Sequence, residues 1–292
     1  MNKVVKTIAL SSLFFTVIGC SSDDNSKTPE GPNFEDKHLV SHVKSTYYWS
    51  NEELNEDGTT QIVPVLDYEI DFNFKYDDNL ALSALTYTVT YYQDEKVKNV
   101  TNGAFNFKFN EAQQLQTLDI TGDIMLRDTY NFTYINNRVS KLESNDGNQK
   151  YEQTFSYNDA HQFIQSEIQS LNLNFDYTYN SKNQIIKIQD NKNELSEQIE
   201  YDSKNNPFKG LPFDLTSIVF EGINFIPLTY TFPNNIKEYK TPYLDTYQLD
   251  YKYDENNNPI KASVYYLNDS QPKELDYEIE YNYITKKVEI NK

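Results

Sequence analysis

The sequence predicts an all-β protein, a long antiparallel meander of repeated hairpins that forms a strongly curved or closed sheet. The first observation is a recurring segment in which polar and aromatic residues alternate, a polar turn follows, and aliphatic residues complete the unit. The second is that the turns are rich in Asn and Asp, which tolerate the left-handed backbone angles of hairpin loops. The third is composition, because the 25 Tyr and 17 Phe fall mainly at strand positions of the repeat.

The repeat is clearest at residues 174–188, and nine copies are spaced 21 to 33 residues apart. The last aromatic residue before each turn anchors the copies at Tyr76, Phe109, Tyr134, Tyr157, Tyr179, Tyr201, Phe232, Tyr253 and Tyr283. An apolar residue lies four positions before the anchor in seven copies, and the exceptions are Gln153 and Glu197. One hairpin cannot bury its face alone, so neighbouring hairpins must pair into a sheet of roughly 16 to 20 strands. A sheet of this width usually curls or closes, which also hides its edges.

The first 19 residues have the layout of a secretory signal peptide. Lys3 and Lys6 precede an apolar run, residues 8–18, that is too short for a membrane span. The run ends in Val17-Ile18-Gly19-Cys20, which resembles the bacterial lipobox, and the resemblance implies cleavage before Cys20 and acylation of its thiol and amine. Cys20 is the only cysteine, so it has no disulfide partner in the chain, which favours lipid attachment over a chance cysteine after an ordinary signal.

Residues 20–40 are predicted to be a flexible tether, because residues 21–32 are polar and contain Pro and Gly. Residues 41–292 then form a single β-repeat domain, since no linker interrupts the repeats. The Ser-Ser-Asp-Asp after Cys20 resembles the surface-export signal of Bacteroidetes lipoproteins, which implies the outer face of the outer membrane. A solubilising linker on a protein that faces the periplasm is the alternative.

The charge argues against two kinds of anionic partner. The chain has a net charge of −18, and loss of two lysines with residues 1–19 leaves 24 basic against 44 acidic residues, or −20. Nucleic acids and anionic lipid surfaces require cationic contacts, so neither is expected as a partner. The expected partners are outer-membrane lipid, through acylated Cys20, and a glycan or protein ligand.

The repeat domain opens with two predicted strands. Residues 43–49 form the first, a turn follows at residues 55–58, and residues 62–70 form the second. Pro64 cannot donate to a ladder, so part of the second strand is expected at a sheet edge.

Farther along, residues 85–91 alternate with period two and predict a long returning strand, and Asn102-Gly103 is interpreted as another hairpin turn. The tightest copies occupy residues 105–200. An apolar insertion near residues 207–225, with a short predicted helix or loop, then interrupts the repeat. This insertion either plugs the curved sheet or exposes an apolar surface to a partner. The residues that would form that surface are Phe208, Leu211, Phe213, Phe220 and Phe225.

Two motifs, Tyr177-Thr178-Tyr179-Asn180 and Tyr251-Lys252-Tyr253-Asp254, are each followed by Asn and an aliphatic residue. They resemble the YD repeats of the RHS family, and residues 201–209 are similar to a motif of uncharacterised Bacteroidetes repeat lipoproteins. The resemblance covers residues 68–290 and implies a sheet built from hairpins. The Gly-Arg that usually follows the YD turn is absent, and neither family supplies catalytic residues for this chain.

Alternating aromatic and polar residues also occur in transmembrane β-barrels. The lipid face of such a barrel is mostly aliphatic at its centre and confines aromatics to two girdles, whereas tyrosines occur throughout this repeat. A lipid anchor would also be redundant in such a barrel. A tethered domain outside the bilayer is therefore the preferred interpretation.

No catalytic, metal or cofactor site is predicted. His38 and His42 have the spacing of helical metal ligands but lack a third ligand, and His161 lies in a turn. Residues 254–258 copy the first half of a calcium loop, but Pro259 stands where glycine is required, so they are interpreted as a hairpin turn. The sequence contains no Gly-rich phosphate loop and no nucleophile elbow.

The leading hypothesis is therefore a lipid-anchored cell-envelope protein, without enzymatic activity, whose β-repeat domain binds a glycan or protein or acts as a scaffold. Two alternatives stay open. A surface polysaccharide hydrolase would need two facing carboxylates about 5 to 10 Å apart. An envelope-assembly or lipid-carrying factor would need a continuous apolar cavity inside the sheet.

Overall fold

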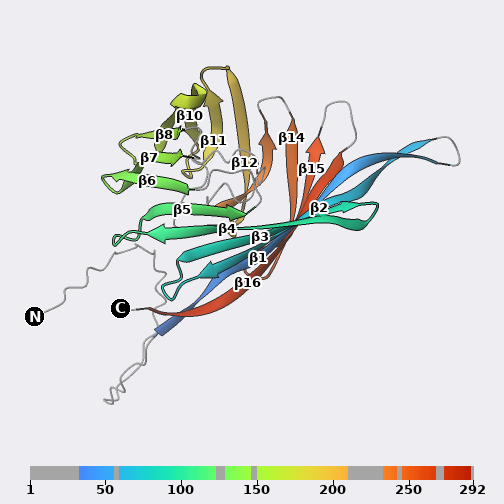
Figure 1. Cartoon of the computed structure of the whole chain (residues 1–292), viewed down its shortest axis with the longest axis horizontal. Coiled ribbons are helices and arrows are strands. Elements are labelled where there is room, and N and C mark those ends of the chain that lie inside the picture. The colour runs from blue at the N-terminus through green and yellow to red at the C-terminus, as the bar shows by residue number, and fades with distance from the viewer. Residues whose placement is uncertain are drawn as a thin grey trace, which may run out of the picture. The chain divides into compact units, whose positions relative to one another are not determined.

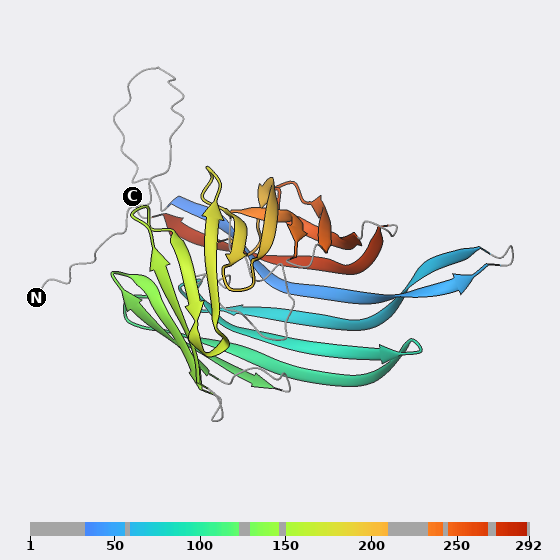
Figure 2. The same ribbon diagram turned by 90° about the horizontal axis from the view of Figure 1, so that it is seen from above.

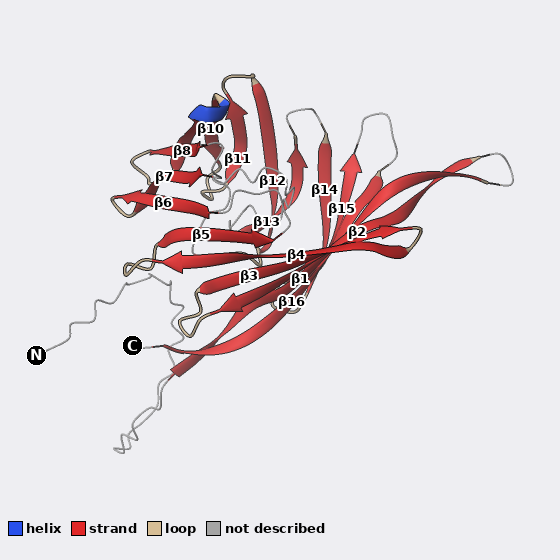
Figure 3. Cartoon of the chain, in the orientation of Figure 1, coloured by secondary structure: helices blue, strands red, loops and turns tan. Residues whose placement is uncertain are grey.

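Sixteen antiparallel strands make up most of the computed structural model of the chain, which describes residues 33–55, 59–122, 129–145, 150–209, 233–241, 245–267 and 273–290. One short 3₁₀ helix, η1 (Gln169–Leu171), is the only helix in these ranges (Figure 3). The strands are β1 (Asn33–Leu54), β2 (Thr60–Tyr76), β3 (Leu82–Gln93), β4 (Lys96–Phe109), β5 (Leu115–Gly122), β6 (Thr129–Ile135), β7 (Arg138–Asn145), β8 (Lys150–Tyr157), β9 (Phe163–Ile168), β10 (Leu173–Tyr179), β11 (Ile185–Asp190), β12 (Leu195–Asn205), β13 (Asn234–Lys240), β14 (Thr246–Tyr253), β15 (Pro259–Leu267) and β16 (Glu274–Ile290).

Each strand pairs with its neighbours in sequence, and β16 returns to pair with β1, so the meander closes into a barrel (Figure 1). The predicted all-β meander is therefore confirmed. Closure pairs the backbone groups of β1 and β16 that would otherwise form free edges. The barrel lies in a unit of residues 37–286. Residues 1–36 and 287–292 form a second unit, of which only residues 33–36 and 287–290 are described.

The first four strands extend past most of the barrel, and the β1–β2 hairpin extends farthest (Figure 2). Pairing of β2 with β3 begins at Tyr68 and Tyr91, so residues 60–66 of β2 pair with β1 alone in the described part of the chain. Pro64 lies in this stretch, opposite Ser50. The predicted edge position of Pro64 is therefore confirmed.

One end of the barrel, called the turn end below, contains five hairpin turns of one design, while the β6–β7 turn there is a two-residue turn at Asn136-Asn137. Each of the five starts with Asn or Asp, whose Oδ1 accepts backbone N–H groups inside the turn. Asn180, for example, accepts from Lys182 and Gln184 at 2.9 and 3.1 Å, and Asn183 has a φ of 63°. This is the Asn and Asp turn chemistry that the repeat predicts. Five such turns occur at residues 77–81, 110–114, 158–162, 180–184 and 254–258.

A recurring hydrogen bond ties successive hairpins together at the turn end. Tyr179, at the end of β10, donates its hydroxyl hydrogen to the backbone carbonyl of Phe163, at the start of β9, over 2.8 Å. The equivalent bond, 2.7 to 2.9 Å long, is made by the anchors Tyr76, Tyr134, Tyr157, Tyr201 and Tyr283. Six of the nine anchors of the repeat therefore link a strand to the one before it, whereas Tyr253 bonds to Asp202 instead.

The interpretation of Asn102-Gly103 as a hairpin turn is wrong. β4 runs through both residues, and the turn lies at Asp94-Glu95, where both residues have positive φ. Gly103 faces Tyr87 on β3, and a Cβ atom at this position would overlap the Tyr87 hydroxyl. The glycine is needed because the Tyr87 ring covers it. In the sequence, the resulting Asn-Gly pair has the same residues as a hairpin turn.

The observed start of β1 differs from the predicted end of the tether. Residues 33–40, assigned to the tether, are part of β1. Residues 35–38 are exposed, so their polar composition resembles that of a linker although the backbone is paired. The predicted signal peptide lies outside the described residues, as does most of the insertion. The base of the insertion is described, and there the backbone N–H of Asn206 donates to the backbone carbonyl of Pro233 over 3.1 Å.

Candidate functional site

The outer face of the barrel wall is charged. Strand alternation sends Thr88 of β3 outward, whereas its neighbours Tyr87 and Val89 are 2% and 5% exposed and face inward. Ion pairs within and between strands are distributed around the wall. They are Lys44–Glu69, Lys108–Asp119, Lys141–Glu143, Lys150–Glu152, Lys240–Glu238, Lys261–Glu278 and Lys273–Asp250.

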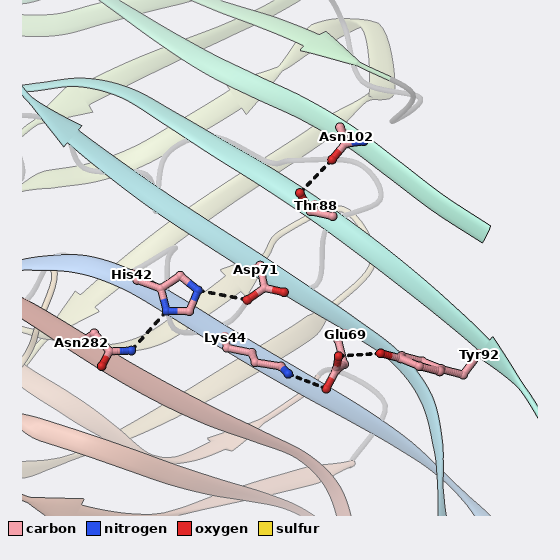
Figure 4. Close-up of polar contacts among 8 residues, drawn as sticks. All are labelled: His42, Lys44, Glu69, Asp71, Thr88, Tyr92, Asn102 and Asn282. Atoms are coloured by element: carbon pink, nitrogen blue, oxygen red, sulfur yellow. Dashed lines mark hydrogen bonds and ion pairs between the residues drawn. The ribbon is translucent and has the colours of Figure 1, made fainter. Parts of the chain in front are cut away.

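Figure 4 shows the part of this face that crosses β16, β1, β2, β3 and β4. The Asn282 amide donates to Nδ1 of His42 over 3.1 Å, so Nε2 carries the proton that Asp71 accepts over 3.0 Å. An acid–histidine pair of this kind would need a nucleophile for catalysis. In the described residues no Ser, Thr or Tyr hydroxyl bonds to the His42 ring, so the pair is a surface contact.

Glu69 is the centre of a second group on the same face. It accepts hydrogen bonds from Lys44 Nζ at 2.7 Å and from the Tyr92 hydroxyl at 2.8 Å (Figure 4). Burial opposes its ionisation, but these hydrogen bonds outweigh that effect and lower the pKa of Glu69. Exposed pairs of this kind contribute at most about 1 kcal/mol each, so the group makes the wall polar without forming a binding pocket.

The inner face of the wall is apolar and aromatic. Side chains with at most 2% exposure on it include Phe72, Leu118, Leu142, Ile185 and Val264. The inner face of the barrel is therefore apolar, whereas its outer face is charged.

The two polar exceptions in the repeat lie on this inner face. Gln153 is fully buried, accepts a hydrogen bond from Tyr151 at 2.8 Å and donates to Ser166 at 3.3 Å. Burial raises the pKa of Glu197, and a hydrogen bond from the Tyr239 hydroxyl opposes this rise. The two exceptions to the apolar pattern thus identified positions where a polar side chain inside the barrel accepts a hydrogen bond from a tyrosine.

Aromatic side chains form a row across four strands at the other end of the barrel, called the loop end. The rings of Tyr277 and Tyr47 stack at 4.6 Å, those of Tyr47 and Tyr68 at 4.3 Å, and Tyr91 follows at 5.9 Å. Trp49 lies two residues after Tyr47 and therefore on the same face of β1. Exposure rises from 2% at Tyr277 and 9% at Tyr47 to 39% at Tyr91 and 51% at Trp49. These five residues are called the rim platform.

A carboxylate lies beside the rim platform. The β15–β16 register skips Asp276 at a β-bulge between Leu275 and Tyr277, and a bulge re-aims the extra side chain. Burial raises the pKa of Asp276 to about 6. Within the described residues Asp276 has no hydrogen-bond or ion-pair partner. Burial also raises the pKa of the tyrosines around it, and the charge of Asp276 adds to the rise at Tyr47, Tyr68, Tyr247 and Tyr277.

Comparison with known proteins supports the barrel architecture. No protein-family model and no curated protein matches the sequence. A porin-like protein of Bacteroides uniformis ATCC 8492 is similar in structure, with a TM-score of 0.55 and 10% identity over 84% of this chain and 96% of that chain. A porin-like protein of Bacteroides vulgatus ATCC 8482 aligns over 85% and 99% of the two chains at 10% identity, but its TM-score of 0.27 is too low to support an argument. The likeness shows a shared fold alone, and the resemblance to RHS repeats stays a prediction.

Only one residue of the predicted partner surface lies in the described part of the chain. Phe208 is 1% exposed, and its ring lies 5.9 Å from Phe74 of β2 and 6.4 Å from Tyr281 of β16. A cavity beside it of about 10 Å³ has room for about one water molecule. Phe208 therefore fills the barrel interior and is not part of an exposed surface. The described ranges do not include Cys20, Leu211, Phe213, Phe220 or Phe225.

Two further features bear on the candidate chemistry. Among the described residues, no helix has the length and apolar character needed to cross a membrane. The same residues contain no group of three or more His, Cys, Asp or Glu side chains placed to hold a metal ion.

The rim platform does not follow from the repeat pattern. Tyr47 and Tyr277 are 230 residues apart and meet only because β16 closes on β1. One signal in the sequence pointed to this region, because Trp49 is the only tryptophan of the chain and follows two tyrosines.

Asp276→Asn is expected to stabilise the protein at pH 8 by about 1 to 2 kcal/mol, a value reduced from the full pKa shift because the carboxylate is partly exposed. The native pKa of about 6 lies above the ordinary value of 3.8, so the native state holds the proton more tightly than the unfolded state. The charge therefore costs stability above about pH 6 and costs nothing below the ordinary value. Urea denaturation at pH 8 and pH 3.5 measures the difference. An equal gain at both pH values, or the same gain from Asp159→Asn in an exposed turn, would contradict this account.

Proposed function

We propose that this protein is a lipid-anchored component of the bacterial outer membrane that binds a protein partner at the rim platform, outside the bilayer and without catalysis. The lipobox-like sequence at Cys20 supports the anchor, and the acidic residues after it support the cell-surface side. The observation that carries the proposal is the concentration of large exposed apolar side chains at the loop end, among them Trp49 and Tyr91 of the rim platform. The porin-like fold is consistent with an envelope protein.

The polarity of the wall supports attachment by the tether instead of by the barrel. A membrane-spanning barrel has an apolar outer band and a polar interior, and one Lys or Arg at the middle of its lipid face costs about 2 to 4 kcal/mol. Here ion pairs occur around the outer face, and the apolar side chains point inward. The fold of a porin-like barrel is thus combined with the polarity of a water-exposed protein.

The exposed apolar side chains favour a protein ligand. In the described residues, five of the eight large exposed hydrophobic side chains lie toward the loop ends of β1 to β4, namely Trp49, Leu54, Tyr91, Val97 and Val100. Their exposures range from 39% to 77%. A sugar would use aromatic ring faces and hydrogen bonds, but aliphatic side chains offer it little. Val100 pairs with Thr90 and therefore lies on the opposite face of the sheet from Tyr91. Large apolar side chains exposed on both faces of these strands are typical of a protein interface.

The path of β1 carries the rim platform to the loop end. Residues 37–54 of β1 run from the turn end to the loop end. The strand from residue 37 to Trp49 spans roughly 40 Å. A partner at Trp49 would therefore meet the protein at the end of the barrel opposite the hairpin turns.

The hydrolase alternative receives no comparable support. Among the described residues, Glu197 and Asp276 are the carboxyl groups whose pKa is raised, mainly by burial. They lie on β12 and β16, with β13, β14 and β15 between them. No contact in the described part of the chain joins them as a catalytic pair.

Photocrosslinking in cells tests the proposal. A photoreactive amino acid in place of Trp49 or Tyr91 is expected to capture one discrete protein, whereas the same group in place of Thr154, exposed on β8, captures none. Trp49→Ala is expected to weaken binding of the captured protein about 30-fold, as for an aromatic hot spot worth about 2 kcal/mol. Failure to crosslink at both platform positions, or a glycan that binds the purified protein through Trp49, would overturn the assignment of a protein partner.

A further inference from the structure

The electrostatics of the rim platform narrow the choice of ligand. The carboxylates of Asp67, Asp245 and Asp276 raise the pKa of the tyrosines around Asp276, and no Lys or Arg of the described residues lowers the pKa of Tyr47, Tyr68, Tyr247 or Tyr277. Asp245 accepts a hydrogen bond from Tyr266 at 2.6 Å. Asp276 has no such partner within the described ranges. Because tyrosine rings also present negative faces, the region attracts positive charge.

A second unpaired group lies next to the first. The Tyr277 side chain is 2% exposed, and in the described structure its hydroxyl has no hydrogen-bond partner. Buried polar groups are nearly always paired, so an unpaired one calls for an explanation. Its ring stacks on Tyr47, and Tyr277 directly follows Asp276 in β16. An unpaired carboxylate and an unpaired hydroxyl therefore lie at the Tyr277–Tyr47 end of the ring row, which continues through Tyr68 to the exposed ring of Tyr91.

We infer that the rim platform binds a Lys or Arg side chain of the protein partner, with the cation held between the Asp276 carboxylate and the tyrosine rings. The inference rests on the proposed function, since it names the group by which the partner is recognised. The carboxylate supplies the opposite charge and the rings supply cation–π attraction. The predicted net charge of −20 on the processed chain steers cations toward the protein.

Trp49 provides the readout, because its fluorescence is the only tryptophan signal of the chain. The full chain, purified in a non-ionic detergent, is titrated with N-acetyl-arginine amide and with the neutral analogue N-acetyl-citrulline amide. A saturable change with the arginine probe is expected, with an affinity about tenfold or more above that of the citrulline probe. An equal response to both probes, or no response to either, would overturn the inference.

Variants of Asp276 provide the control. Asp276→Asn is expected to abolish the preference for arginine, and Asp276→Glu is expected to keep it because the charge remains. Thermal unfolding confirms that both variants are folded. If the Asp276→Asn variant still prefers the arginine probe to the citrulline probe, the inference is wrong. If photocrosslinking at Trp49 captures a protein but the arginine preference is absent, the inference fails and the proposed function stands. If crosslinking fails, the proposed function fails whatever the probes show.

Discussion

Gly103→Val is expected to destabilise the barrel by about 3 kcal/mol or more, as overpacking does in a filled core. A Cβ atom at residue 103 would overlap the hydroxyl of Tyr87 and the backbone carbonyl of Thr121. The Tyr87 ring has little room to move, since it is 2% exposed and lies between Phe72 and Phe105, whose ring centroids are 6.5 and 5.6 Å away. Thermal unfolding should show a midpoint about 6 to 12 °C lower.

Two controls separate this overlap from a general cost of valine in β4. Ala104→Val places the same side chain on the outer face of the next residue and should change stability by less than about 0.5 kcal/mol. Tyr87→Ala removes the ring that the introduced valine would strike but leaves the Thr121 carbonyl in place, so adding Gly103→Val to it should cost less than in the natural chain without becoming neutral. Full additivity of the two substitutions would show that Tyr87 is not the reason for the glycine.

The second large effect is expected from four simultaneous Tyr→Phe substitutions, at Tyr134, Tyr157, Tyr179 and Tyr201. Each removes a hydroxyl that donates to a backbone carbonyl of the preceding strand over 2.7 to 2.9 Å and leaves the ring in place. One such bond contributes about 0.5 to 1.5 kcal/mol. The four together should therefore lower the free energy of unfolding by about 2 to 6 kcal/mol, as measured by urea denaturation.

Tyr265→Phe is the matched control. In the described structure its hydroxyl has no hydrogen-bond partner, and its ring contacts Lys273 at 3.8 Å, a contact that phenylalanine keeps. It should change stability by less than about 0.5 kcal/mol. If the fourfold variant is as stable as this control, the repeated hydrogen bond does not hold the hairpins together.

Much of the barrel follows from local sequence because each hairpin is a local structure. The alternation places Tyr179 and its equivalents inward, and Asn or Asp directly afterwards starts the turn. The spacing of nine anchors predicted 16 to 20 strands, and the observed sixteen agree. Even the exceptions at Gln153 and Glu197 identified polar groups on the inner face.

The remaining features depend on contacts between distant parts of the chain. Asn102-Gly103 has the local signature of a turn, and only the ring of Tyr87 across the ladder shows why the glycine lies within a strand. Asp276 faces the rim platform because of a bulge against β15, which no pattern within β16 reveals. The platform itself requires the pairing of β16 with β1. For the same reason, the repeat predicted a curved or closed sheet without deciding between the two.

Fluorescence of a tryptophan on the wall tests most directly that this barrel faces water and is held at the membrane by its tether. The lipid-modified protein with Trp49→Phe and Thr154→Trp has its only tryptophan midway along β8, on the outer face, and is reconstituted into vesicles of lipids with brominated acyl chains. We predict that acrylamide in the buffer quenches this tryptophan and that the brominated chains do not. Strong quenching by the brominated chains, with little by acrylamide, would place the wall in the bilayer and contradict the account.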